Sequence, residues 1–147
     1  WALAESLREW TTSRVLELVY TSWDLEDFGK DCGYHGAAFH WDEDRRFLIR
    51  CELDAAFFHL YGISHEDVEY IMETFPIVKR HDLKGHGTYR TKETILKIYE
   101  RLREAIETGK PYRTILVPPP ADPKCCHPPR EKLTRGNAEG GLVSGKG

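Results

Sequence analysis

The segment from residue 42 to residue 62 constrains the fold most, because its apolar residues recur every three or four positions. Asp42 can cap the start of a helix by accepting a backbone N–H, and Gly62 can end it in the left-handed conformation. The spacing therefore predicts a core helix over 43–61 whose buried stripe contains Phe47, Leu48, Cys51, Ala55 and Phe58. Asp54 and His59 are better explained as satisfied polar groups at the margin of the core than as an acid–base pair.

Shorter segments on both sides also have helical spacing. Residues 2–10 and 14–22 predict two short helices, the second capped by Ser13. Ser64 and Asp67 come close to a capping box before a helix over 65–74.

The last helical segment covers residues 91–108. Thr91 can cap its start, Gly109 can close it, and its expected buried face contains Ile95, Tyr99, Leu102 and Ile106. We therefore predict an all-α fold, a small irregular helical bundle without a sheet of three or more strands.

Between the last two helices the sequence predicts an extended basic loop. Pro76 offers no N–H, and the residue before a proline is displaced from the helical region, so we expect extended chain through 75–78. Five cations face one acid, Asp82, between Phe75 and Lys92, which gives a local net charge of +4. The cations are Lys79, Arg80, Lys84, Arg90 and Lys92.

Charge is also divided between the two halves of the chain. Residues 1–74 carry a net charge of −10 and residues 75–147 a net charge of +7, although the whole chain has only −3. Such a division allows the halves to attract each other, to dock on a charged partner, or to leave a basic face free for phosphate. Composition does not choose among these.

The 147 residues suffice for about one domain. Seven of the eight prolines and a glycine-rich end follow residue 110, so we expect a helical domain over 1–110 and an extended arm with a disordered tail over 111–147. No apolar run approaches the roughly 20 residues of a membrane span, and the first residues lack the pattern of a signal peptide. We expect a cytoplasmic chain with no membrane partner, and its start at Trp1 suggests a piece of a longer protein.

The motifs of common active sites are absent from the sequence. It has no glycine-rich phosphate loop, no Gly-x-Ser-x-Gly and no His-Glu-x-x-His, so we predict no catalytic residues. The four cysteines lack the paired spacing of zinc sites, and we predict no metal. The alternatives are a metal clasp formed by Cys125, Cys126 and His127, or an acidic site at residues 42–44, where helix capping is the simpler explanation.

Several blocks of sequence nevertheless occur in a familiar order: LELVYTSWDL, FHWDEDRRFLIRCELDAAFFHLYGIS, YIMETFPIVKR, GTYRTKETIL and VPPPADP. Over about residues 14–123 the chain resembles the C-terminal region of large bacterial adenine-specific DNA methyltransferases, of the type IIG-like restriction-modification and phage-defence group. In that family S-adenosylmethionine and an Asn-Pro-Pro-Tyr-type motif belong to an upstream Rossmann-like domain. The resemblance implies no cofactor in this chain and S-adenosylmethionine in the parent enzyme. Residues 118–120 are Pro-Pro-Pro and do not form that motif.

Residues and resemblance together predict a noncatalytic module that helps to hold double-stranded DNA or packs on the catalytic domain of the parent. The candidate DNA-backbone contacts are Lys79, Arg80, Lys84, Tyr89, Arg90 and Lys92. Alternatively, these cations pair with the acidic half and Tyr89 belongs to the core. The rival hypothesis is a protein-interaction module that docks a companion defence subunit, and an independent nuclease or hydrolase is a third. Phosphate binding should weaken steeply with salt, whereas apolar docking should not.

Overall fold

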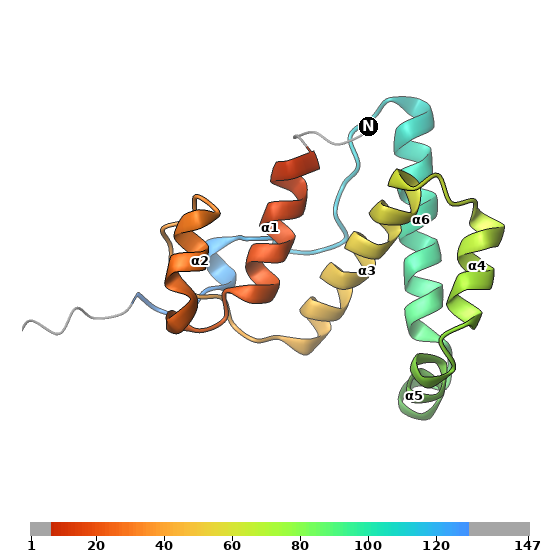
Figure 1. Ribbon diagram of the computed structural model, residues 1–147, viewed down its shortest axis with the longest axis horizontal. Coiled ribbons are helices and arrows are strands. Elements are labelled where there is room, and N and C mark those ends of the chain that lie inside the picture. The colour runs from red at the N-terminus through yellow and green to blue at the C-terminus, as the bar shows by residue number, and fades with distance from the viewer. Residues whose placement is uncertain (1–6, 130–147) are drawn as a thin grey trace, which may run out of the picture.

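The computed structural model describes residues 7–129 and shows an all-α fold, as predicted (Figure 1). Within this range the only β-type pairing is an isolated antiparallel bridge between Phe39 and Cys126. The helices are α1 (Leu7–Val19), η1 (Trp23–Leu25), α2 (Glu26–Asp31), α3 (Glu43–Leu60), α4 (His65–Glu73), α5 (Pro76–His86), α6 (Arg90–Thr108) and η2 (Pro123–Cys125).

Helices α3 and α6 form the centre of the structure, with α4 packed on the other side of α6 and α1 beside α3 (Figure 1). The predicted caps of α3 are confirmed: the Asp42 carboxylate accepts from the Arg45 amide at 2.9 Å, and Gly62 has a φ of +67°. The central core consists of the buried residues Trp10, Cys51, Ala55, Ala56, Val68, Met72, Tyr89, Ile95, Ile98, Tyr99, Leu102, Ala105 and Tyr112.

Four residues predicted for the core are less buried than the spacing suggested. Phe47, Leu48 and Phe58 are only half-buried, and Phe47 and Phe58 pack against the edge of the core. Ile106 remains 41% exposed, and its neighbour Ala105 is buried instead. The reason is geometric, because successive helix positions differ by about 100°, so the inward stripe at the end of α6 passes through Ala105.

The two short helices predicted near the N-terminus are wrong, because α1 runs without a break from Leu7 to Val19. Ser13 does not cap a new helix. Its hydroxyl donates to the Trp10 carbonyl oxygen at 2.9 Å, within the helix. The predicted helix over 2–10 falls partly on residues 1–6, which lie outside the described residues.

The predicted extended basic loop is also wrong, because residues 76–86 form helix α5. Pro76 occupies the first helical position, where its missing N–H has no partner to lose and its fixed φ suits the helix. Phe75 has the non-helical backbone that a residue before proline prefers. Gly87, with a φ of +75°, ends α5 and donates to the Leu83 carbonyl oxygen at 3.1 Å.

A buried ion pair joins α1, α3 and the arm that follows α6. Glu52 is fully buried and accepts from the Arg14 guanidinium at 2.7 and 2.8 Å. The second oxygen of the same carboxylate accepts from the Tyr112 hydroxyl, the Thr114 hydroxyl and the Ile115 amide at 2.7, 2.7 and 3.0 Å. Burial, followed by the negative charge of Glu52, raises the pKa of the Tyr112 hydroxyl, so this group stays a donor.

A second buried carboxylate fixes the next part of the arm. Glu17 on α1 accepts from the Arg45 guanidinium and, at 2.8 Å, from the Ala121 amide. Arg45 also donates to the carbonyl oxygens of Pro118 and Pro119 at 2.7 and 2.8 Å. The arm therefore follows α1 and α3 as part of the folded body up to η2, and the tail from residue 130 lies outside the described residues.

Two isoleucines on α6 provide a matched test of the core. Ile98 is 1% exposed and Ile106 is 41% exposed. We expect Ile98→Ala to lower the free energy of unfolding by about 2 to 5 kcal/mol, and Ile106→Ala to cost clearly less, because only the first leaves a cavity. Urea unfolding of both variants measures this, and equal losses would show that the wrong face of α6 has been placed inside.

The buried carboxylate can be tested in the same way. Glu52→Ala leaves the buried Arg14 guanidinium without its carboxylate, and we expect a loss of about 3 to 5 kcal/mol. Glu107→Ala removes an exposed carboxylate from α6 and should change stability by less than about 0.5 kcal/mol. Similar melting of the two variants would contradict the structural role of Glu52.

Candidate functional site

Helix α5 is the candidate site, because it is an eleven-residue helix that contains no buried residue. It lies below α4 and at the lower end of α6 in Figure 1, where it packs on α6. An isolated helix of this length is marginal in water, since helix formation requires a costly nucleus. The anchors of α5 are therefore its capping residues, its contacts with α6 and an ion pair with the end of α4.

A set of large apolar side chains is exposed on α5 and on the adjoining end of α4. Ile77 is 64% exposed and Tyr70 is 73% exposed. Phe75, Val78 and Leu83 are also exposed. We call these five residues the apolar surface of α5. The residues on α5 point in different directions around the helix, because successive positions differ by about 100°. So many large exposed apolar side chains on one short segment are still informative, since exposed apolar groups often mark interaction sites.

Two of the six predicted DNA contacts share one acidic partner. Glu73, the last residue of α4, accepts from the Lys79 and Lys92 ammonium groups at 2.6 and 2.9 Å. Hydrogen bonds from these two lysines, Lys79 first, hold the pKa of the Glu73 carboxyl below its ordinary value. The two lysines therefore connect α4 with α5 and α6.

Two further candidates also have partners within the chain. The Arg90 guanidinium pairs with Asp44 at 3.1 Å and lies 4.1 Å from the centre of the Phe47 ring, so it connects α6 to the start of α3. Tyr89 is buried in the core, and its hydroxyl donates to the Met72 carbonyl oxygen at 2.7 Å. The alternative in which these residues serve the fold is thus the one that their contacts favour.

Arg80 and Lys84 differ from the other four candidates. Both side chains are exposed, and neither has an ion-pair partner among residues 7–129. They stand four residues apart and so occupy the same side of α5. The one acid of the helix, Asp82, is turned toward α6, where its carboxylate accepts from the Thr91 amide at 2.6 Å. This corrects the predicted cap of α6, which Asp82 supplies instead of Thr91.

The histidine and the cysteines singled out in the sequence have structural contacts. The ring of His59 stacks on Tyr99 at 3.8 Å, and its Nε2–H donates to the Tyr99 carbonyl oxygen at 2.8 Å. Burial lowers the pKa of His59, which keeps the ring neutral near pH 7. Asp54 takes no part in the contact between His59 and Tyr99. Burial also raises the pKa of the Cys51 thiol to about 12, so that it is not a nucleophile near neutral pH.

The cysteines at the end of the arm contact the segment that follows α2. Cys126 Sγ lies 3.2 Å from the Tyr34 hydroxyl, and the Cys125 carbonyl oxygen accepts from the His40 amide at 2.8 Å. His127 donates its amide to the Ala38 carbonyl oxygen at 2.8 Å. No three His, Cys, Asp or Glu side chains in the described part of the chain are arranged to hold a metal ion.

Comparison with protein-family models, with curated proteins and with solved structures gave no match for this chain. Of the helices in residues 7–129, none is long and apolar enough to cross a membrane.

Proposed function

We propose that this chain is a noncatalytic helical module of an adenine-specific DNA methyltransferase from a restriction-modification or phage-defence system, and that it packs on the catalytic part of the parent enzyme through α5. The parentage is supported by the ordered sequence blocks described above. In such an enzyme S-adenosylmethionine and the methyl-transfer residues belong to the catalytic part, and this module helps to fix that part relative to DNA.

The apolar surface of α5 is the observation that carries the packing proposal. A phosphate backbone offers no contact that compensates for exposed Ile77, Leu83 and Phe75 side chains, whereas a protein surface does. Burying an isoleucine or leucine side chain completely contributes about 1.5 to 3 kcal/mol. A companion defence subunit is the alternative occupant of the same surface.

A second candidate function is the holding of DNA by α5. It is favoured by Arg80 and Lys84, which are exposed on one side of the helix with no acid paired to them among the described residues. Contacts from these two groups would position a duplex without reading its sequence. The four remaining sequence candidates support this function less, because Lys79, Lys92, Arg90 and Tyr89 are engaged within the chain.

The parentage is tested by the open reading frame that encodes the chain. We expect an Asn-Pro-Pro-Tyr-type motif and a glycine-containing donor-binding segment upstream of Trp1 in the same frame. Sequencing of the gene decides this, and a frame that lacks both would contradict the proposal.

Two matched double variants on α5 separate packing from DNA holding. If packing is correct, Ile77→Ser with Leu83→Ser should weaken binding to the separately expressed upstream part by at least about tenfold. Arg80→Gln with Lys84→Gln should then leave that binding nearly unchanged, even at raised salt. Calorimetric titration gives both affinities.

The opposite pattern would favour DNA holding. In that case the Arg80 and Lys84 variant weakens DNA binding of the parent equally for cognate and unrelated duplexes, and the slope of log affinity against log salt falls by about 1 unit per lost contact. If the apolar variant binds the upstream part as tightly as the unchanged chain, the packing proposal fails.

A further inference from the structure

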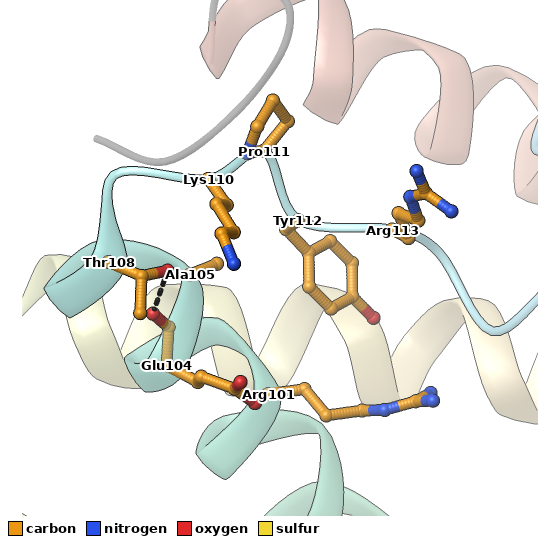
Figure 2. A pocket seen from close by; sticks show the side chains of 8 residues that line it. All are labelled: Arg101, Glu104, Ala105, Thr108, Lys110, Pro111, Tyr112 and Arg113. Carbon is orange, nitrogen blue, oxygen red and sulfur yellow. Dashed lines mark hydrogen bonds between the residues drawn. The ribbon is translucent and has the colours of Figure 1, made fainter.

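A pocket of about 650 Å³ opens between the last two turns of α6 and the start of the arm (Figure 2). Its walls are Arg101, Glu104, Ala105 and Thr108 on α6, and Lys110, Pro111, Tyr112 and Arg113 on the arm. Gly109, with a φ of +66°, turns the chain at the end of α6 so that these two segments face each other. The pocket is at the far end of α6 from α5 and is separate from the surface considered above.

The charged residues of this pocket are mostly cations. Three cations, Arg101, Lys110 and Arg113, and one carboxylate, Glu104, line it. No hydrogen bond or ion pair joins any of the three cations to an acid within residues 7–129, in contrast to Lys79, which is paired with Glu73. The C-terminal end of a helix contributes about half a negative charge. This is smaller than the net charge of +2 that the four side chains supply, so the pocket stays positive.

The pocket is held in shape by a residue that faces the core. Tyr112 stands between Lys110 and Arg113 in the sequence, and its hydroxyl donates to buried Glu52 at 2.7 Å. Its ring packs against the Trp10 ring in a T-shaped arrangement, with the ring centres 6.5 Å apart. Figure 2 shows the Lys110 ammonium directed toward α6, the Arg101 guanidinium extending below the Tyr112 hydroxyl, and the Arg113 guanidinium directed away from both. The backbone that carries the arm cations is therefore fixed before any ligand arrives, which lowers the cost of binding.

We propose that this pocket is a phosphate-binding site, in which the long, exposed side chains of Arg101 and Lys110 turn from the two walls toward one phosphate group and Arg113 contacts a neighbouring one. A guanidinium offers paired N–H donors that match phosphate oxygens, and a lysine ammonium adds a compact charge. The volume lies in the range of small-molecule sites. Such a phosphate group belongs either to a nucleic-acid backbone or to a free phosphate or nucleotide. Both sources present the same anionic oxygens to the pocket.

The test uses the full chain and matched charge-removing variants. Arg101→Gln with Lys110→Gln removes two pocket cations, and Lys97→Gln with Arg103→Gln removes two cations from α6 outside the pocket. The probe is a short fluorescein-labelled DNA, and its anisotropy gives the affinity from about 50 to about 200 mM salt. We expect the pocket variant to bind at least about tenfold more weakly, with a salt slope lower by about 2 units, and the control variant to bind like the unchanged chain.

Competition then separates the two phosphate sources. Displacement of the labelled DNA by inorganic phosphate or ATP at millimolar concentration assigns the site to a free phosphate ligand, and resistance to both assigns it to a nucleic-acid backbone. Both results support the phosphate site. Equal losses in the two double variants, or no binding of DNA, ATP or phosphate by the unchanged chain, would overturn it. Thermal melting of each variant verifies that the fold is kept, and failure of α5 to dock on a catalytic part leaves this result unaffected.

Discussion

The carboxylate of Glu52 is the contact on which the arrangement of the chain depends. It lies in the interior, where an unpaired charge would be very costly, and it is satisfied by one cation and three further donors. Arg14 brings α1 to α3, while Tyr112 and Ile115 bring the arm to the same place. A buried ion pair adds little net stability compared with apolar packing. Its effect here is to fix which segments lie together, and the pocket beside Tyr112 is a consequence of that arrangement.

Helix α5, unlike the arm, is held by local capping contacts and not by buried side chains. Its beginning is set by Pro76, its end by Gly87, and Asp82 ties it to the first turn of α6. None of its side chains is buried, so little apolar contact stabilises its position. The exposed apolar side chains of α5 can therefore be buried against the surface of another protein or domain. This contrast with the anchored arm is why we assign docking to α5 and phosphate binding to the pocket.

The sequence predicted the elements whose signals are local. The caps Asp42 and Ser64, the stops Gly62 and Gly109, and the helix over 91–108 are all present at or within a residue of the predicted positions. The extended loop at 76–86 was wrong, because a proline is compatible with the first turn of a helix as well as with the end of one. The cue that favours a helix is the glycine eleven residues later, at position 87.

The contacts that the sequence could not supply are those between distant segments. Local charge density selected Lys79, Arg90 and Lys92, and their partners Glu73 and Asp44 are identified only once the helices are packed. The pocket was missed for the same reason, since its two walls, on α6 and on the arm, face each other only because the chain turns at Gly109. Arg14 and Glu52 are 38 positions apart, and no periodic or local pattern in the sequence predicts that they pair.

Amide hydrogen exchange of the full chain tests most directly the claim that buried carboxylates make the arm part of the folded body while α5 is held weakly. The Ile115 and Ala121 amides donate to Glu52 and Glu17, so they should exchange about as slowly as amides in the middle of α6. The amides of α5 should exchange faster than those of α6. Exchange of the Ile115 and Ala121 amides at the rate of an unstructured chain would contradict the account.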